Sequence, residues 1–317
     1  VRLKGRHGVQ LLPGMMGIFL LLFADDIALI STTPAGLQNQ INSLIQVSNT
    51  LRLKVNSEKT KIMIFRKGGH LSKGEKWVLD GTKLEVVNKY KYLGFVFTTR
   101  LSINSALDEI ATKGKQKCVQ ILKVLWNLRC NEPKVFTKLF DSQVQSSLMY
   151  SAEIWGHESH SAIEKVHMFG WKRFLGLGPK TPNHMLYGDL GRFPLYINGC
   201  ARSIKYWLKL GEMGTERLPK QAYIMLCQCP IPEGKNWAKA IELCLFRLGF
   251  GFVWLNGGVG DTNCFLRTFK LRLKDCYMQE WNCANNSSKR YECYSSFQTD
   301  MLKKEYFSFI HIKKFRD

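Results

Sequence analysis

The sequence predicts an α+β chain in which short antiparallel β-hairpins with one packed helix precede a mainly α-helical remainder. Over the first hundred residues, short apolar runs alternate with turn residues, and one segment repeats its apolar residues at helical spacing. From residue 101 onward, apolar residues recur every three or four positions, which is the period of an amphipathic helix. We expect three regions, at residues 1–100, 101–178 and 179–317.

The first hairpin is predicted within GIFLLLFADDIALIS (residues 17–31), after a basic start that does not resemble the beginning of a domain. Two runs of large apolar residues flank Asp25 and Asp26. This pattern predicts two buried strands joined by a tight turn at the two acids, since Asp tolerates turn geometry. The packed helix follows, with Thr33 as its N-cap and Pro34 in its first turn, and extends for about five turns.

Three further segments predict β structure. KTKIMIF (residues 59–65) alternates polar and apolar residues, as a half-buried strand does. WVLDGTKLEVV (residues 77–87) has an Asp-Gly turn at Asp80 and Gly81, which predicts a hairpin. YKYLGFVFT (residues 90–98) is rich in aromatic and β-branched residues, which favours another strand.

The helical part begins with one long amphipathic helix between Ile103 and Leu125. Another helix is predicted from near Pro133 to about residue 150. A third is predicted at residues 161–174, starting with a capping box between Ser161 and Glu164. The loop at residues 176–184 is a plausible region boundary, and the remainder is predicted to be mainly helical.

The charge of the chain points to a polyanionic partner. Lys and Arg number 46 against 25 Asp and Glu, a formal net charge of +21. A protein this basic typically binds nucleic acid or an anionic membrane surface. The longest apolar run, residues 15–24, is shorter than the roughly 20 residues of a spanning helix, so we expect no membrane segment.

The ten cysteines are scattered without a paired spacing, which favours reduced thiols and an intracellular protein. The expected location is the nucleus and cytoplasm. Cys227 and Cys229 are too close together for a usual zinc pair, and no histidine spacing completes a site. We therefore expect no zinc. No protein partner is predicted.

Asp25 and Asp26 are the residues with the clearest chemical potential. Adjacent half-buried carboxylates repel each other, unless a cation lies in front of them. Mg²⁺ prefers oxygen ligands and typically uses one or two carboxylates together with phosphate oxygens. Two such ions can activate an attacking hydroxyl and stabilise a leaving phosphate. The pattern leaves a solvated surface turn open as the alternative.

Several blocks of the sequence, in order along the chain, resemble a known family. FADD (residues 23–26) between apolar strands resembles the motif C hairpin of reverse transcriptases. LKVNSEKTKIMIF (residues 53–65) resembles motif D of the non-LTR, LINE-type retrotransposon enzymes, and YKYLGFVFT resembles their motif E, the primer grip. SLMYSAEIWG (residues 147–156) and KTPNHMLYGDLGRFPL (residues 180–195) resemble the helical segments that follow.

The resemblance covers residues 8 to 210 and is weak beyond them. It implies a partial palm with motifs C to E at residues 1–100, a helical thumb at 101–178 and a helical C-terminal connector at 179–317. The implied reaction is RNA-directed DNA synthesis, a nucleotidyl transfer assisted by two Mg²⁺ ions. The implied partners are an RNA template, a DNA primer and deoxynucleotides.

The resemblance also implies roles for individual residues. Asp25 and Asp26 would be catalytic metal ligands. Lys59 would be a motif D lysine near the phosphates of the incoming nucleotide, in a loop shaped by Asn56. The primer-grip turn would consist of Tyr92, Leu93 and Gly94.

Basic residues on the first long helix suggest a nucleic-acid surface. We expect four lysines there to contact the phosphates of template and primer, although a solvated lysine face is the simpler alternative. These residues are Lys113, Lys115, Lys117 and Lys123. In FGWKRF (residues 169–174), Trp171 beside Lys172 and Arg173 suits base stacking, but such an aromatic is more often part of a core.

The departure from the family is as informative as the match. Working enzymes have fingers, a motif A that supplies another catalytic Asp, and a motif B, all upstream of FADD. About two dozen residues precede FADD here, so we expect a fragment with little or no polymerase activity on its own.

Two rival hypotheses remain. One is a non-catalytic nucleic-acid-binding remnant, and the other is an unrelated Mg²⁺-dependent phosphohydrolase using Asp25 with further acids.

Overall fold

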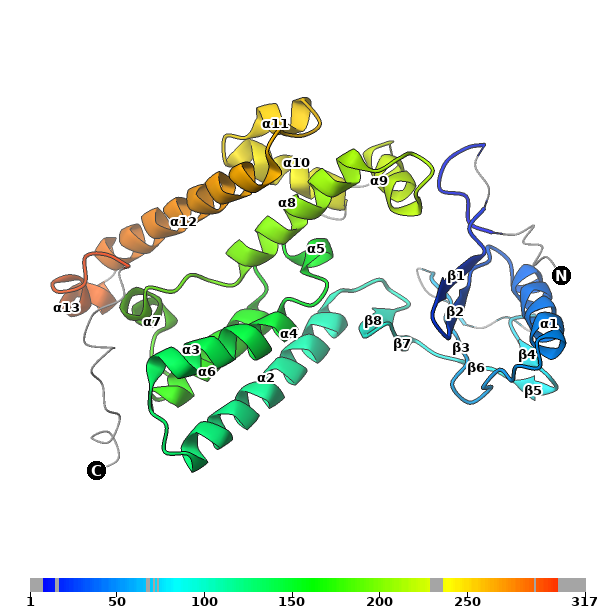
Figure 1. Ribbon diagram of the computed structural model, residues 1–317, viewed down its shortest axis with the longest axis horizontal. Helices are drawn as coiled ribbons and strands as arrows, with labels where there is room; N and C mark the ends of the chain where they lie inside the picture. Colours follow the sequence, from blue (N-terminus) through cyan, green and yellow to red (C-terminus); the bar gives the residue numbers. More distant parts are fainter. Residues whose placement is uncertain are drawn as a thin grey trace. The chain divides into compact units, whose positions relative to one another are not determined.

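The computed structural model describes residues 8–14, 17–66, 69, 70, 72, 74–228, 236–287 and 289–301. The chain divides into two compact units, one of residues 1–106 with 215–229 and one of residues 107–214 with 230–317. Short β-hairpins and one long helix occupy the N-terminal part, and helices follow (Figure 1). The predicted α+β class is therefore confirmed.

The first unit contains four two-stranded sheets among its described residues. Three are antiparallel hairpins, and the fourth is a parallel pair of β3 with β6. The elements are β1 (Leu20–Phe23), β2 (Asp26–Leu29), α1 (Pro34–Thr50), β3 (Lys61–Ile62), β4 (Val78–Leu79), β5 (Thr82–Lys83), β6 (Glu85–Val86), β7 (Lys89–Tyr92), β8 (Phe95–Thr98) and α9 (Leu218–Gln228).

The start of α1 follows the prediction. The Thr33 hydroxyl accepts a hydrogen bond of 3.1 Å from the backbone N–H of Gly36, and Pro34 occupies the first turn. The core beneath this helix is a cluster of five buried residues, namely Ile41, Ile62, Trp77, Leu79 and Leu84. The Trp77 indole N–H donates to the Pro34 carbonyl at 3.0 Å, which fixes the helix start to the β4–β5 hairpin.

Two strand predictions need correction. The segment at residues 59–65 forms strand only at Lys61 and Ile62, because Asn56 holds the preceding residues in a turn and the partner β6 is equally short. The segment at residues 90–98 belongs to a hairpin rather than to one strand. Its chain reverses at Leu93 and Gly94, where both φ angles are positive.

The second unit is helical throughout its described residues. Its elements are α2 (Asn104–Asn127), which begins in the first unit, α3 (Pro133–Leu139), the π-helix η1 (Phe140–Gln145), α4 (Ser146–Leu148), α5 (Ala152–Trp155), α6 (Ser161–Phe174), α7 (Asn183–Leu190), α8 (Tyr196–Glu212), α10 (Trp237–Arg247), α11 (Gly251–Leu255), α12 (Thr262–Ser287), the 3₁₀-helix η3 (Lys289–Tyr291) and α13 (Glu292–Ser295).

Aromatic side chains form the centre of this unit beneath α6. The ring of Phe136 stacks on Phe174 with centroids 4.3 Å apart, and it meets Trp171 edge-on at 4.9 Å. Trp171 is 2% exposed, so it belongs to the core and does not present its ring for base stacking. This result decides between the two readings of FGWKRF in favour of the core.

The predicted capping box at α6 is wrong. The helix begins at Ser161, its N-cap is His160, and no side chain caps it. The Glu164 carboxylate instead accepts hydrogen bonds from the Tyr187 hydroxyl at 2.9 Å, the Tyr196 backbone N–H at 3.0 Å and His167 Nδ1 at 3.3 Å. Tertiary partners on α6, α7 and α8 thus replace the local cap, and Glu164 joins three helices.

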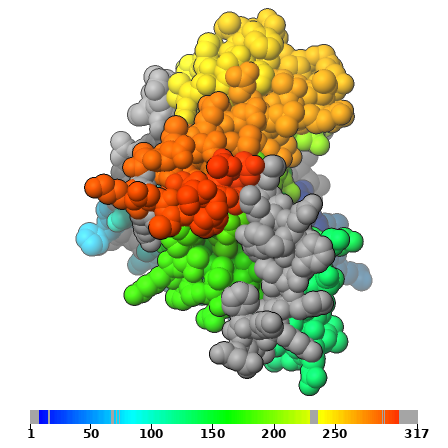
Figure 2. All heavy atoms as spheres, turned by 90° about the vertical axis from the view of Figure 1, so that its left-hand side faces the viewer, coloured from blue at the N-terminus to red at the C-terminus, as the bar shows by residue number. Residues whose placement is uncertain are grey.

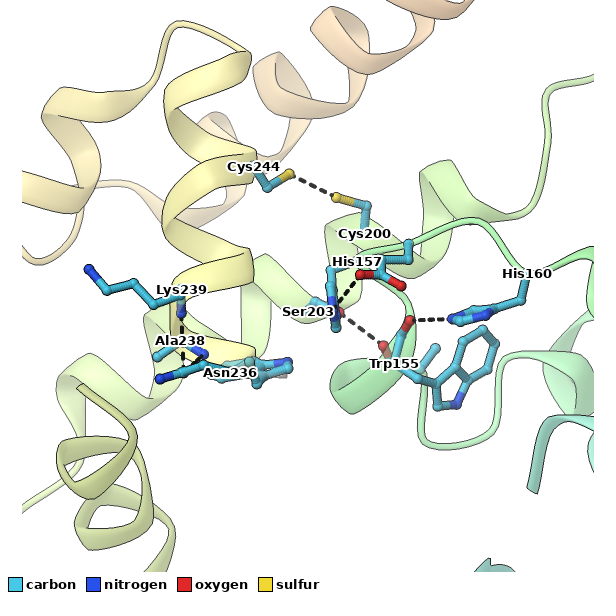
Figure 3. Close-up of polar contacts among 12 residues, drawn as sticks. Trp155, His157, His160, Cys200, Ser203, Asn236, Ala238, Lys239 and Cys244 are labelled. Atoms are coloured by element: carbon cyan, nitrogen blue, oxygen red, sulfur yellow. Dashed lines mark hydrogen bonds and ion pairs between the residues drawn. The ribbon is translucent and has the colours of Figure 1, made fainter. Parts of the chain in front are cut away.

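The α5–α8 contact is made by backbone. Gly156 at the end of α5 faces Gly199 in α8 so closely that an added Cβ on Gly199 would lie 2.9 Å from the Gly156 oxygen. Beside it, the Ser203 hydroxyl donates to the Ala152 carbonyl at 3.0 Å. Next to Gly199 in α8, the thiol of Cys200 lies 3.3 Å from that of Cys244 in α10 (Figure 3). The nine cysteines at described positions are all free thiols.

α12 is an outer helix of the second unit and lies exposed along one side of it (Figure 2). The C-terminal end of α12 packs on α7 through aromatic rings. The imidazole of His184 stacks between Trp281 at 4.8 Å and Tyr291 at 4.5 Å, and the Trp281 indole N–H donates to the His184 carbonyl at 2.9 Å. Among the described residues, every helix is too short or too polar to traverse a lipid bilayer.

Buried histidines make the stability of the second unit dependent on pH. Burial lowers the pKa of His157, His167 and His184 below the ordinary 6.5. The unfolded chain therefore binds protons that the folded chain does not, so stability falls as the pH drops below 6.5. The completely buried His167 alone should contribute up to about 1.4 kcal/mol per pH unit. Urea unfolding at several pH values between 8 and about 5 measures this slope.

The matched variant is His167→Asn, whose amide keeps a donor near the Nδ1 position and does not titrate. Its stability should depend less steeply on pH than that of the unmodified chain. Identical slopes for the two proteins would contradict the role of this residue.

Candidate functional site

Asp25 and Asp26 lie at the closed end of the β1–β2 hairpin. In the register of the strands, Phe23 pairs with Asp26, so Ala24 and Asp25 form the two-residue turn and Asp26 is the first residue of β2. Ala24 has a φ of 51°, in the left-handed region that a residue with a Cβ enters at a cost of about 1 kcal/mol. Both carboxylates are exposed. The hairpin therefore presents two adjacent acids to the solvent.

The prediction that the flanking strands are buried is wrong. Leu22 is 64% exposed and Phe23 is 62% exposed, while Leu29 packs against the core cluster of the first unit. The hairpin is a sheet of two strands, and two strands alone cannot cover both of their faces. The exposed side chains of Leu22 and Phe23 on β1 thus form an apolar surface next to the two acids.

Lys59 lies in an exposed turn before β3. The Asn56 side-chain oxygen accepts from the Lys59 backbone N–H at 3.0 Å, and the Asn56 carbonyl accepts from the Thr60 hydroxyl at 2.7 Å. Asn56 thus shapes the loop, as predicted. The Tyr90 hydroxyl of β7 donates to the Lys59 carbonyl at 3.2 Å. This link between the Lys59 turn and the β7–β8 hairpin was not foreseen, since no pattern relates residues 31 positions apart.

Tyr92, Leu93 and Gly94 form the end of the β7–β8 hairpin. Tyr92 pairs with Phe95, and the turn residues Leu93 and Gly94 have φ angles of 48° and 82°. Two successive positive φ angles are the signature of a type I′ turn, which matches the twist of the flanking strands. The three predicted site segments of the first unit, those of Asp25, Lys59 and Leu93, are therefore turns.

The family model of reverse transcriptase (RNA-dependent DNA polymerase) matches residues 3–97, the part of the chain that contains these turns. Residues 3–97 belong to a reverse transcriptase domain. No curated protein and no solved structure matches the chain.

Reverse transcriptases typically use Mg²⁺, and the residues present fit this ion in part. Two exposed carboxylates at one turn are the kind of donor that Mg²⁺ accepts, with phosphate oxygens and water as its other ligands. Within the described ranges, no group of three His, Cys, Asp or Glu side chains is placed to hold a metal. Asp25 and Asp26 would therefore hold the ion from one side, and a further protein ligand is not among the described residues.

The four lysines of α2 do not share one face of the helix. At 100° per residue, Lys113 and Lys117 lie on one side of the buried stripe and Lys115 on the other, while Lys123 faces away from it. Three of them have internal partners. Lys113 pairs with Glu109 at 3.7 Å, Lys117 donates to the Ser147 hydroxyl at 2.6 Å, and Lys115 lies 5.1 Å from the ring of Phe169.

This arrangement limits what the lysines can do together. A single nucleic-acid backbone along α2 would meet the pair of Lys113 and Lys117 or the side with Lys115, and not all four at once. Their contact with nucleic acid stays a prediction.

Proposed function

We propose that this chain is the motif C-to-E part of a non-LTR retrotransposon reverse transcriptase with its following helical region. The single observation that supports this most is the β1–β2 hairpin, which holds Asp25 and Asp26 at its end within the matched reverse transcriptase domain. In this proposal the substrates are an RNA template, a DNA primer and deoxynucleotides.

The turns at Asp25, Lys59 and Leu93 each have a proposed role in the reaction. Asp25 and Asp26 hold Mg²⁺, which when bound stabilises developing charge on the phosphates and favours attack by a hydroxyl. Lys59 faces the phosphates of the incoming nucleotide, and the Tyr90 bond sets the distance between its turn and the primer grip. Tyr92, Leu93 and Gly94 hold the primer end. Catalysis of phosphoryl transfer depends mainly on such positioning and on charge stabilisation.

We further propose that these 317 residues alone are inactive as a polymerase. The described residues offer two carboxylates at the hairpin and bring no third acid to them. This observation favours the rival candidate function, a non-catalytic nucleic-acid-binding protein, for the chain when it is by itself. It also weighs against the phosphohydrolase, which needs further acidic ligands around Asp25.

Primer extension and duplex binding together test the proposal. With Mg²⁺, an RNA template and a DNA primer, the 317-residue chain should extend the primer no further than its Asp25→Asn variant does. The same chain should bind an RNA–DNA duplex in a salt-sensitive manner, and binding should survive the Asp25→Asn and Asp26→Asn substitutions.

Each assay has its own contrary outcome. Extension that depends on Asp25 would overturn the proposed inactivity and establish a working polymerase. Failure to bind any RNA–DNA duplex would overturn the proposed nucleic-acid function itself. Turnover of a simple phosphate ester that requires Asp25 would support the phosphohydrolase in its place.

A further inference from the structure

α8 and α12 pack against each other in the second unit and run in opposite directions (Figure 1). Near the start of α8, the hydroxyl of Tyr196 is within electrostatic reach of Glu280, in the later half of α12. Six residues further along α8, Arg202 is within reach of Lys270, ten residues earlier on α12. The two helices therefore bring together residues that are 84 and 68 positions apart in the sequence, and the separation shrinks along α8 as it does in an antiparallel pair.

Four cations meet along this helix pair. Arg202 and Lys205 are three residues apart on α8, and Lys270 and Lys274 are four residues apart on α12, so each pair lies on one side of its helix. Burial lowers the pKa of Lys270, and the nearby charges of Lys274, Arg202 and Lys205 lower it further. The packing of α8 against α12 and the spacing of these residues on each helix bring the four side chains to one region of the surface, in agreement with the effect of the other three charges on Lys270.

The described part of the chain supplies no counter-charge to this cluster. None of the four cations has a carboxylate within 4.0 Å at a described position. Their contacts are with neutral groups. The Arg202 guanidinium donates to the Met149 carbonyl at 2.8 Å, and the Lys274 ammonium lies 5.1 Å from the centre of the Phe193 ring. Within the described residues, no carboxylate thus neutralises the cluster, and neutral groups hold two of its side chains.

Such a cluster costs folding energy. Like charges one helical turn apart destabilise a helix, and Lys270 is in addition half buried. An anionic ligand would remove the repulsion, and a chain of phosphates would do so for several cations at once. The lysines of α2 differ in this respect, since three of those four have partners inside the protein and point in different directions.

We propose that Arg202, Lys205, Lys270 and Lys274 form a binding site for the phosphate backbone of an RNA–DNA heteroduplex. The choice of ligand rests on the proposed function, because the matched domain implies template and primer. The site consists of ammonium and guanidinium groups, which bind phosphates without reading the bases. We therefore expect binding that is strong at low salt and independent of sequence.

The test measures binding of the full 317-residue chain to a fluorescently labelled RNA–DNA duplex of about 20 base pairs. Anisotropy titrations at several salt concentrations from about 50 to 200 mM give the slope of log K against log salt. Lys205→Gln with Lys274→Gln should reduce the magnitude of this slope by about two, one for each phosphate contact. It should weaken binding by roughly tenfold or more at the lowest salt.

The matched control is Lys165→Gln with Arg272→Gln. It removes the same charge from exposed positions that do not act on Lys270, one of them on α12 itself. This control should leave the slope close to that of the unmodified chain. A duplex of different sequence should give the same slopes for all three proteins.

Thermal unfolding tests whether the cluster variant is intact. Removal of like charges should leave the midpoint unchanged or raise it, so weaker binding with an unchanged midpoint supports a direct contact. If the midpoint falls, Lys205→Arg with Lys274→Arg provides the second measurement. That variant retains the charge, and loss of binding in it would overturn the proposal.

The failures can be told apart. Equal weakening by the cluster variant and the control would overturn this site and leave the proposed function standing. No salt-sensitive binding by the unmodified chain would overturn both. Loss of binding to phosphatidylserine vesicles with unchanged duplex binding in the cluster variant would assign the cluster to a lipid surface and overturn the nucleic-acid site.

Discussion

Glu164→Ala is expected to lower the free energy of unfolding of the second unit by about 3 kcal/mol or more. The substitution leaves three groups without their acceptor, namely the Tyr187 hydroxyl, the Tyr196 backbone N–H and the Nδ1 of His167. Each buried donor left unsatisfied costs about 1–3 kcal/mol. The buried Nε2 of His167 has no hydrogen-bond partner among the described residues, so this side chain cannot compensate for the loss.

Urea unfolding followed by tryptophan fluorescence measures this loss. Seven of the eight tryptophans lie in the second unit, so the signal reports mainly on it. The control is Glu158→Ala, whose carboxylate is 62% exposed and pairs with His157 at 3.8 Å. Exposed pairs contribute little, so we expect a change below about 1 kcal/mol. A similar small change for Glu164→Ala would show that the three helices do not depend on this carboxylate.

Gly199→Val should have an effect of similar size, about 3 kcal/mol, through steric overlap rather than polar loss. A Cβ at this position would lie 2.9 Å from the Gly156 oxygen and 3.0 Å from the Gly156 Cα. Both are backbone atoms, which cannot rotate away as a side chain would. The α5–α8 contact must therefore open. Replacement of a glycine inside a helix usually stabilises the protein, since Gly is less favourable there than Ala by about 1 kcal/mol. At Gly199 we expect destabilisation instead.

Gly211→Ala in the same helix is the control. Its Cβ would meet a single atom, the Gly257 oxygen, at 3.3 Å. A shift of a few tenths of an ångström relieves that contact, so the midpoint in urea should move little. If Gly199→Val unfolds at the same urea concentration as the unmodified chain, the close backbone approach is not important for stability.

The parts of the fold that could be predicted have local causes. Thr33 and Pro34 start α1 because capping and the fixed φ of proline act within one turn. The Asp80-Gly81 turn forms for the same kind of reason, since both residues accept positive φ angles and have them here. The long helix at 104–127 follows from its apolar period.

Other features depend on partners distant in the sequence. The apolar run of β1 predicts a buried strand, yet burial needs a neighbour on each face, and no described residue covers Leu22 and Phe23. Glu164 matches the capping pattern, but its carboxylate accepts hydrogen bonds from the Tyr187 hydroxyl and the Tyr196 backbone N–H instead of capping its own helix. In YKYLGFVFT, the aromatic and β-branched residues predict one strand, and only the resemblance to the family placed a turn at residues 92–94, where Leu93 is not a usual turn-forming residue.

In the candidate site too, some features follow from the local sequence and others depend on residues distant in the sequence. Local sequence placed Asp25, Lys59 and Leu93 in segments that all prove to be turns, and their roles in catalysis and primer binding stay predictions. The cations of the α8–α12 pair were not foreseen. Their spacing on each helix is ordinary, and only the antiparallel packing of the two helices brings them together.

The π-helix at residues 140–145 makes the length of this segment matter as much as its composition. Phe136, Phe140, Val144 and Leu148 repeat every four residues and are all completely buried. In a uniform α-helix each such step rotates by about 40°, so the row would turn by roughly 120° over three steps. The wider π turn accommodates one extra residue and takes up part of this rotation. Deletion of one residue here would restore a regular helix in which Phe136 and Leu148, then 11 residues apart, differ by only about 20° and still share a face. A second inserted residue would instead rotate them further apart, so we expect the lineage of this protein to tolerate the loss of one residue in this segment more readily than a further insertion.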